Sequence, residues 1–407
     1  MWRHLYSILL TLATPALIWH VVRKYRRQGQ PAHVAARLGL HRPKISPGVV
    51  WIHACSLGES KVALALAAQL KAEDPSLQLM FTATTPAGLT ELQSSAHPVA
   101  VFPWDLPWVW GPWLSRLQPR ALVVIETELW PNLIAACVRA EVPVILANGR
   151  LSEKSFLSYQ RLSEFTRPMW AGLTRALMQF SNDALRAQAL GTPQKRIGEV
   201  GSVKLDQPDL PVNPARDKAL CAWKQQHKVV CLMSGHPGED ALLYPLLDTG
   251  YRLLLVPRHP VRGDAIMREI EALGLTGARV SEDALDAHVQ ILVGDTFGEM
   301  GSYLRAADVV VIGGSFAGHG GQNPVEPARL GKPIVAGPFM YNFAHITESL
   351  QAHGGLIQTD PETLPTAVAE ALDQANALGS KARDWVLANQ GSTERQVTVI
   401  RSLLKPL

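Results

Sequence analysis

The feature that most constrains this chain is a repeated alternation of short apolar runs with helical stretches. Apolar runs occur at 49–54, 77–83, 121–126 and 142–147, and a helical pattern follows each of them. Continuous apolar character is typical of strands buried on both faces, as in a parallel sheet covered by helices. The pattern therefore predicts a doubly wound α/β domain in the first half of the chain.

The same alternation starts again after a proline-rich stretch. Residues 207–214 hold three prolines, which is typical of a linker. With 407 residues, 47% of them hydrophobic, the chain is long enough for two such domains. We predict one domain over 28–206, a linker at 207–214 and a second domain over 215–407, behind a separate segment at 1–27. The apolar runs of the second half lie at 228–233, 251–257, 289–294, 307–314 and 333–337.

The N-terminal segment has the composition of a membrane anchor. Residues 5–22 carry no formal charge, and as a helix they would be roughly 27 Å long, close to the ~30 Å hydrocarbon core of a bilayer. The basic run RKYRR follows directly, the reverse of the order in a cleaved signal peptide. The positive-inside rule then keeps the domains behind it in the cytoplasm. Polar residues and a proline within 5–22 leave a buried or in-plane helix open as the alternative to a span.

Charge is distributed unevenly along the chain. The net charge is +4, but residues 1–50 hold eight basic residues and no acidic one, so the remainder carries −4. A body with so little charge argues against a nucleic-acid binder. The four cysteines show no CxxC spacing, and no HExxH or paired-histidine pattern occurs. We therefore expect reduced thiols, no protein-held catalytic metal and no cofactor.

A second group of residues is expected at the membrane surface. Arg37, Arg42 and Lys44 extend the basic flank, and a tryptophan-rich stretch lies at 103–113. Tryptophan favours the headgroup level, where its ring is half wet. The alternative is an ordinary loop packed on the core. The tryptophans in question are Trp104, Trp108, Trp110 and Trp113.

Carboxylates follow two apolar runs of the first half. Ligands of open parallel sheets bind outside the carboxyl ends of the strands, so these loops are where chemistry is expected. Ser56 and Glu59 match a capping box, and Glu59 also suits a general base at a cleft. Glu126 and Glu128 point to the same side if the strand continues. They could instead begin a helix with Pro131 in its first turn.

One lysine near the linker is singled out by its position. Lys204, in GSVKLD, is either a solvated surface residue or a cation at the mouth of the cleft between the two domains.

In the second half, three loops could hold a nucleotide. SGHPGED at 234–240 has small residues where backbone N–H groups could approach a phosphate. Arg258, after the next run, can form a bidentate pair with a phosphate, whereas His259 is expected to be structural. Five glycines lie within 313–321, a pattern that also suits a sugar nucleotide.

Helix capping explains two further motifs of this half without a ligand. Asn323, Pro324 and Glu326 fit the N-cap, first and third positions of a helix. Thr296 and Glu299 fit a second capping box.

Seven motifs occur in an order that resembles one known family. They are HACSLGE, ETELWPNL, NGRLS, GSVKLD, LVPRHP, GDTFGEM and GGSFAGHGGQNPVEPA. The chain is similar to 3-deoxy-D-manno-octulosonic acid (Kdo) transferases of lipopolysaccharide core biosynthesis. The resemblance implies a GT-B fold, in which two Rossmann-like domains face a cleft. It also implies CMP-Kdo as donor, a lipid A precursor (lipid IVA) as acceptor, and the cytoplasmic side of the inner membrane as location.

The resemblance also implies roles for individual residues. It makes Glu59 the proton acceptor of an inverting single displacement, and makes Glu126 and Lys204 stabilisers of the transition state. The rival interpretations are a GT-B transferase that uses a UDP-sugar and a non-catalytic membrane-bound scaffold. The residues implied in CMP binding are Pro257, Arg258, Phe297, Gly298, Glu299, Asn323, Pro324, Val325 and Glu326.

Overall fold

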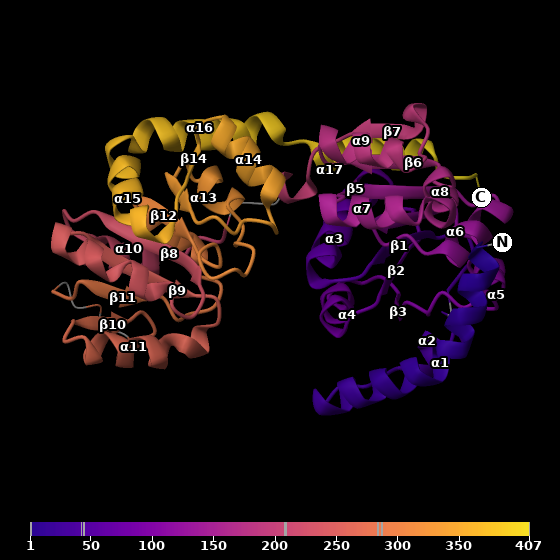
Figure 1. Ribbon diagram of the computed structural model, residues 1–407, viewed down its shortest axis with the longest axis horizontal. Helices are drawn as coiled ribbons and strands as arrows, with labels where there is room; N and C mark the ends of the chain where they lie inside the picture. The colour runs from indigo at the N-terminus through magenta and orange to yellow at the C-terminus, as the bar shows by residue number, and fades with distance from the viewer. Residues whose placement is uncertain are drawn as a thin grey trace. The chain divides into compact units, whose positions relative to one another are not determined.

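The computed structural model shows two compact α/β units (Figure 1). Each contains a seven-stranded parallel sheet with helices on both faces. The prediction of two doubly wound parallel-sheet domains is confirmed. The first unit comprises Met1–Gln207 with Gln390–Leu407, and the second comprises Pro208–Asn389. The structure describes residues 2–406 apart from 42, 44, 207–209, 283, 284, 286 and 287.

The sheet of the first unit has the strand order β3-β2-β1-β4-β5-β6-β7. Strands β1, β2 and β4 are buried at every position, as their continuous apolar sequences predict. Because β1 pairs with both β2 and β4, their carboxyl ends lie at one edge of the sheet. The strands are β1 (Val50–Ala54), β2 (Leu79–Ala83), β3 (Val99–Val101), β4 (Ala121–Ile125), β5 (Val144–Gly149), β6 (Arg175–Met178) and β7 (Ile197–Glu199).

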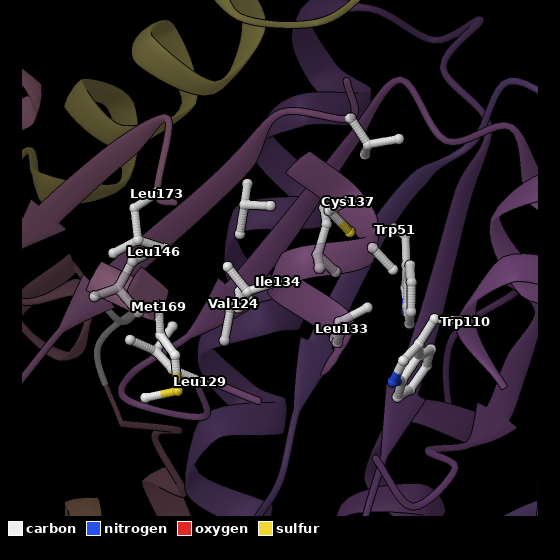
Figure 2. Packing of buried hydrophobic residues seen from close by; sticks show 14 of the residues in the cluster. Trp51, Trp110, Val124, Leu129, Leu133, Ile134, Cys137, Leu146, Met169 and Leu173 are labelled. Carbon is white, nitrogen blue, oxygen red and sulfur yellow. The ribbon is translucent and has the colours of Figure 1, made fainter. Parts of the chain in front are cut away.

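Successive residues of these strands enter two separate cores. Trp51 and Val124 face one core, which Figure 2 shows packed against Leu133 and Ile134 of α6 (Pro131–Arg139). Ile52 and its equivalents face the other core, on the opposite side of the sheet. The remaining helices of this unit are α2 (Val34–Arg37), α3 (Leu57–Glu73), α4 (Pro86–Gln93), α5 (Trp110–Leu117), α7 (Glu153–Arg161), α8 (Ser163–Ala171), α9 (Ser181–Ala189), α17 (Ser392–Ser402) and the N-terminal α1 (Trp2–Arg27).

The end of the chain belongs to the first unit. The sequence-based division ended the second domain at residue 407, whereas residues 390–407 group with the first unit. The reason is α17, whose Val397 and Ile400 are fully buried in the core on the α3 side of the first sheet. Of the predicted linker, residues 207–209 lie outside the described residues, and Pro214 already begins α10 (Pro214–Lys224).

The second unit has the strand order β10-β11-β9-β8-β12-β13-β14. Its strands are β8 (Val229–Gly235), β9 (Arg252–Pro257), β10 (Gly277–Arg279), β11 (Ile291–Val293), β12 (Val309–Ile312), β13 (Ile334–Ala336) and β14 (Leu356–Gln358). Its further helices are α11 (Gly263–Ala272), α12 (Met300–Ala306), α13 (Val325–Arg329), α14 (Ala344–Ala352), α15 (Leu364–Asp373) and α16 (Ala375–Asn389).

By length and composition, helix α1 is long and apolar enough to cross a membrane. Both of its ends nevertheless contact the first unit. The Ser7 hydroxyl donates to Asn132 Oδ1 at 3.0 Å, and near the other end the Arg37 guanidinium donates to the Tyr25 hydroxyl at 3.3 Å. Between them the helix exposes large apolar side chains, among them Ile8, Leu9 and Leu12.

The prediction that a second group of residues faces the membrane is wrong for several of its members. Trp110 and Trp113 are fully buried and pack against Trp51, with ring centroids 6.0 and 5.8 Å from it. Arg37 is also buried, because it bonds to Tyr25 and to the Thr84 carbonyl. Trp104 packs against the core at its margin, whereas Trp108 is exposed. Arg42 and Lys44 lie outside the described residues.

Candidate functional site

Glu59 is held by a capping box at the carboxyl end of β1. Ser56 is the N-cap of α3 and accepts from the Glu59 N–H at 3.4 Å. In return, the carboxylate accepts from the Cys55 N–H at 2.7 Å and from the Ser56 hydroxyl at 2.8 Å. The predicted cap is therefore confirmed. Each carboxylate oxygen has two lone pairs, so this cap leaves acceptor capacity on Glu59.

The strand β4 ends before the two carboxylates that follow it. Glu126 has a φ of 58°, in the left-handed region that a residue with a side chain seldom occupies. The strand therefore does not continue through the two glutamates, and the chain turns at 126–127 instead. Helix α6 begins at Pro131, so the alternative is correct about Pro131 but wrong about the two glutamates, which lie outside the helix. A strained residue that the surrounding fold maintains is typical of functional sites.

Lys204 forms an ion pair with Glu126 at the carboxyl edge of the first sheet. Its Nζ lies 3.7 Å from Glu126 Oε1, and both side chains are half-buried. Asn148, at the end of β5, fixes the backbone beside Lys204, because its side chain accepts from the Val203 N–H at 3.0 Å. Asn148 is itself fully buried. Lys204 is thus a positioned cation rather than a solvated one.

Three glutamates at this edge influence one another electrostatically. Burial raises the pKa of Glu59, hydrogen bonds from Cys55 and Ser56 oppose the shift, and the charge of Glu126 adds to it. Burial and the charges of Glu59 and Glu126 raise the pKa of Glu128 to about 7. We call Glu59, Glu126, Glu128 and Lys204 the carboxylate cluster. Burial, together with repulsion among its carboxylates, makes it a place where a proton can be taken up near neutral pH.

In the second unit, the glycine-rich loop after β12 is held by a protein carboxylate. Glu239 is 1% exposed, and its two oxygens accept from the N–H groups of Gly314, Phe316 and Ala317 at 2.6, 2.9 and 3.3 Å. Glu239 also accepts from the His236 N–H at 2.8 Å. The N–H of His236, within the loop expected to approach a phosphate, therefore already has a protein partner.

The glycine-rich sequence is required by close backbone contact. A Cβ on Gly313 would lie 2.3 Å from the Ser234 carbonyl oxygen, so β12 can lie against β8 there only with glycine. The loop also places His319 against His236, with ring centroids 4.1 Å apart. Burial lowers the pKa of His236, and the charges of His319 and Arg258 add to this effect.

Arg258 lies at the carboxyl end of β9, as predicted. Its N–H donates to the Gly235 carbonyl at 2.9 Å, while its side chain is exposed and close enough to His236 to affect that residue's pKa. Pro257, the residue before it, is buried as the last residue of β9. Arg258 and the glycine-rich loop therefore lie at the same end of the second sheet.

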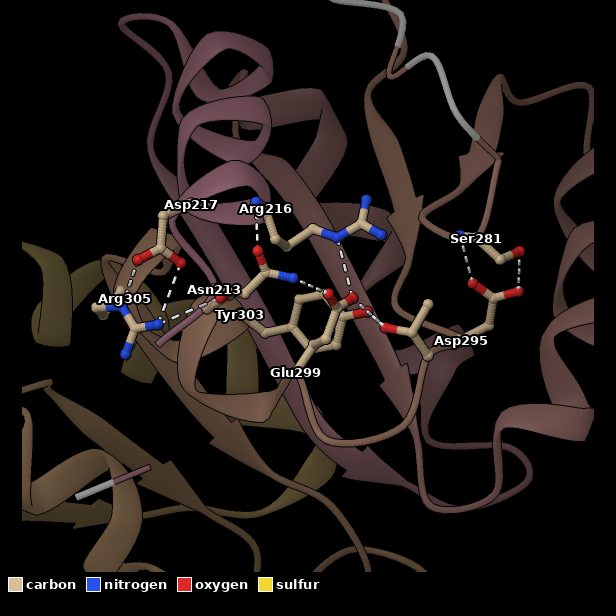
Figure 3. A network of polar contacts seen from close by, with 10 residues as sticks. Asn213, Arg216, Asp217, Ser281, Asp295, Glu299, Tyr303 and Arg305 are labelled. Carbon is tan, nitrogen blue, oxygen red and sulfur yellow. Dashed lines mark hydrogen bonds and ion pairs between the residues drawn. The ribbon is translucent and has the colours of Figure 1, made fainter. Parts of the chain in front are cut away.

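Glu299 is tied to α10 rather than to the start of a helix. Figure 3 shows its carboxylate accepting from Arg216 Nε at 3.0 Å and from Asn213 Nδ2 at 2.6 Å. Helix α12 begins only at Met300, so the predicted capping box at Thr296 is wrong. The Thr296 hydroxyl still bonds to Glu299, at 2.5 Å.

Phe297 is 86% exposed, the highest value among the large apolar side chains that the structure describes. Gly298 beside it has a φ of 77°, which favours glycine. The loop therefore presents an aromatic ring to solvent on a turn that glycine permits.

The segment 323–326 caps α13 one residue later than predicted. The helix begins at Val325, so Pro324 precedes it. Asn323 still acts as a cap, because its Oδ1 accepts from the Val325 N–H at 3.1 Å. The Asn323 amide also donates to Glu326 at 3.3 Å. Capping chemistry therefore accounts for this segment in the described structure.

Two important residues were not among the sequence-predicted site residues. Glu128 was noticed as a partner of Glu126 but given no role, and its raised pKa depends on burial that a sequence does not display. Glu239 lay in a noted loop, but the glycine-rich loop that it holds is about 75 residues away along the chain. Among the described residues, no three His, Cys, Asp or Glu side chains are grouped to hold a metal.

Fold and sites together define a class. Two parallel-sheet α/β units, with polar residues collected at the carboxyl ends of the strands, are the architecture of the GT-B fold. MurG of Acinetobacter baumannii has this fold in common with the chain, with a TM-score of 0.57 at 17% identity over 88% of this chain and 100% of that one.

The family follows from sequence comparison. A family profile described as 3-Deoxy-D-manno-octulosonic-acid transferase (kdotransferase) matches residues 32–207. A 3-deoxy-D-manno-octulosonic acid transferase of Bordetella pertussis is 32% identical over 99% of this chain and 100% of its own length. One from Haemophilus influenzae is 29% identical over 100% of this chain and 99% of its own length. The chain belongs to the Kdo transferase family and is therefore a glycosyltransferase.

Proposed function

We propose that this chain transfers Kdo from CMP-Kdo to the acylated, phosphorylated disaccharide lipid IVA, with Glu59 as general base. The observation that carries the proposal is the carboxylate cluster at the carboxyl ends of β1 and β4. There Glu59 is electrostatically coupled to Glu126, and Lys204 is 3.7 Å from Glu126. The family supplies the transferred sugar, and the cluster supplies groups suited to activating a hydroxyl.

The reaction is a single displacement that inverts the anomeric carbon. The acceptor hydroxyl oxygen forms a bond to the anomeric carbon of Kdo while the bond from that carbon to the CMP phosphate oxygen breaks. The hydroxyl proton passes to Glu59, and the bonding electron pair leaves with CMP. Burial favours the neutral form of Glu59, which raises its pKa and so strengthens it as a base.

Cations balance the charge that develops during transfer. Lys204, held next to Glu126, is proposed to stabilise the transition state together with that residue. Arg258 is proposed to pair with the CMP phosphate, which suits its exposed position at the end of β9. Phe297 is exposed enough to stack on a nucleoside. The full set proposed to contact CMP is Pro257, Arg258, Phe297, Gly298, Glu299, Asn323, Pro324, Val325 and Glu326.

The test is the mass of the product. Purified protein is incubated with CMP-Kdo and a tetraacylated lipid A precursor, and in parallel with UDP-sugars. Mass increments of one or more Kdo on the lipid with CMP-Kdo alone would support the proposal and give the number of sugars added. Transfer from a UDP-sugar, or no transfer from any donor, would contradict it.

We further propose that α1 attaches the protein to the cytoplasmic face of the inner membrane while lying in the plane of the bilayer. Ser7 and Tyr25 both contact the first unit, although 18 helical positions separate them by roughly 27 Å. A helix crossing the bilayer between these points would require the globular unit to cross with it. The in-plane arrangement instead presents the exposed apolar face of α1 to lipid, with the basic run 23–27 at one end.

Vesicle binding tests this arrangement. Leu12 is 73% exposed on α1, and Leu185 is 63% exposed on α9. Leu12→Glu is expected to reduce co-sedimentation with anionic vesicles at least several-fold, because it places a charge in the lipid-facing surface. Leu185→Glu is the matched control and should bind as the wild type does. Equal binding by the two variants would contradict the proposed orientation.

A further inference from the structure

A groove of about 610 Å³ lies beside the carboxylate cluster in the first unit. Its walls come from α1, the start of α6, and helices α7 and α8. Aromatic and aliphatic side chains dominate the lining, including Tyr6, Trp130, Tyr159, Phe165 and Met169. A concave apolar site of this size is typical of small-molecule binding. Leu129 and Met169 of the lining also belong to the core in Figure 2, but the capping and transfer chemistry described above do not use this groove.

The groove is continuous with the residues proposed to carry the reaction. Leu129 and Trp130 line it, and they follow Glu128 directly in the chain. On the opposite wall, Tyr159 is close enough for the charge of Glu128 to raise its pKa, in addition to the larger effect of burial. A ligand in the groove would therefore reach the edge of the sheet where the carboxylate cluster lies.

The other side of the groove is formed by the helix that we propose to lie in the bilayer. Tyr6 of α1 lines the groove, and its ring lies 5.4 Å from that of Phe165. Its neighbours Leu5 and Leu9 are exposed on the outer surface of the same helix. Apolar side chains exposed on α1 thus lie next to the residue through which α1 lines the groove.

The polar residues of the groove favour an anionic amphiphile. Among the described lining residues there is no aspartate or glutamate, whereas Lys154 is present on α7. Ser155 and Ser158 of the same helix also line the groove. A phosphate at Lys154 and hydrocarbon against Tyr159 and Phe165 would satisfy both kinds of surface.

We propose that this groove binds one acyl chain of the lipid acceptor, with Lys154 facing an acceptor phosphate. The proposal rests on the proposed function and adds a binding site to it. The groove would then hold the acceptor with its sugar at the carboxylate cluster while its remaining chains stay in the membrane. Acyl-chain length would affect acceptor affinity through this one surface.

The test fills the groove from the exposed side of α7. Ser158→Trp places a large side chain in it, and Leu157→Trp, at the next position but outside the lining, is the matched control. Ser158 is exposed, so the change should leave the fold intact. The KM for a tetraacylated acceptor is expected to rise roughly ten-fold in Ser158→Trp and to stay unchanged in Leu157→Trp. The KM for CMP-Kdo, and for an acceptor with shortened chains, should not change in either variant.

Photocrosslinking gives a readout that is independent of turnover. An acceptor with a photoreactive group at the end of an acyl chain should label peptides covering 153–169, and Ser158→Trp should abolish that labelling. Wild-type KM values in Ser158→Trp, or labelling that a phospholipid of equal chain length displaces as well as the acceptor does, would overturn the groove proposal. Those results would leave the transfer reaction standing. A wild-type protein that transfers no Kdo would instead overturn the proposed function.

Discussion

Glu59 shows how one residue can cap a helix and still be available for catalysis. Its carboxylate completes the capping box of α3, which is enough to explain its presence. The same bonds fix its direction at the carboxyl end of β1, where a general base must not move. The capping role and the catalytic role of this residue are therefore compatible. A variant that keeps the cap but removes the base tests the catalytic role by itself.

Glu59→Gln makes that separation. The amide retains an oxygen that can accept from the Cys55 N–H, so the free energy of unfolding should change by less than about 1 kcal/mol. Loss of the base should lower the rate of Kdo transfer by roughly 10²–10⁴. Ser56→Ala is the control, since it loses the cap, at a cost of about 1 kcal/mol, but retains the carboxylate. Turnover by Glu59→Gln at the wild-type rate would contradict the role as general base and leave helix capping as the role of Glu59.

The raised pKa of Glu128 predicts how the free energy of unfolding depends on pH. Burial and the charges of Glu59 and Glu126 raise its folded-state pKa from 4.5 to about 7. The folded state therefore binds this proton more tightly than the unfolded state, and stability is lost as the pH rises from about 5 to 8. Glu128→Gln should make the loss over that range smaller, as measured by urea denaturation at each pH. The exposed Glu141→Gln should keep the wild-type slope, and the same slope in Glu128→Gln would refute the assignment.

The sequence predicted which residues gather in the first unit but not their conformations. Glu126 was singled out because it follows an apolar run and Lys204 because it lies near the linker, and the fold brings their side chains within 3.7 Å. The left-handed backbone of Glu126 has no local signature, because it is imposed by the contacts around the turn. The contribution of Glu128 depends in the same way on burial by distant residues.

At the scale of elements, strand prediction succeeded where burial is continuous. Strands β1, β2 and β4 are buried at every position and have unbroken apolar sequences. By contrast β3 and β10 are three residues long and half-buried throughout, so they carry no such signal. Trp110 and Trp113 were misjudged for a related reason. They enter the core through a short helix that packs against Trp51, a contact that local sequence does not reveal.

The glycine-rich loop is an element whose shape depends on one distant carboxylate. Glu239 accepts from backbone N–H groups at 236, 314, 316 and 317, joining the loop after β8 to the loop after β12. Both loops lie at the end of the sheet where Arg258 is found. A nucleotide site there would depend on Glu239 without necessarily touching it.

Glu239→Ala should therefore weaken both folding and nucleotide binding. Several buried N–H groups lose their acceptor, which should lower the free energy of unfolding of the second unit by about 2–5 kcal/mol. Calorimetric titration should show weaker CMP binding because the loop is no longer held. Glu271→Ala, which removes an exposed glutamate of α11, is the control and should change neither quantity. An unchanged CMP affinity in a folded Glu239→Ala protein would separate the loop from the nucleotide site.

At the scale of the whole molecule, the chain visits the first unit twice. Residues 390–407 return to it after the second unit is complete. Within this segment, the Gln396 side chain accepts a hydrogen bond from the Asn148 N–H at 2.7 Å. Asn148 in turn bonds to Val203, the residue before Lys204. The last helix of the chain therefore supports the part of the first unit that positions Lys204. A family motif such as NGRLS predicts that its residues matter, but not which distant residue bonds to them.

This connectivity predicts which unit a C-terminal substitution destabilises. Ile400 of α17 is fully buried against the first sheet, whereas Val368 of α15 is fully buried in the second unit. Ile400→Ala should cost about 2–5 kcal/mol, through lost burial and the cavity left behind, and only in the transition of the first unit. Val368→Ala should affect only the other transition. Calorimetry with and without CMP identifies each, because a ligand raises the midpoint of the unit that binds it. A lowered CMP-responsive transition in Ile400→Ala would show that the C-terminal helix supports the nucleotide-binding unit instead.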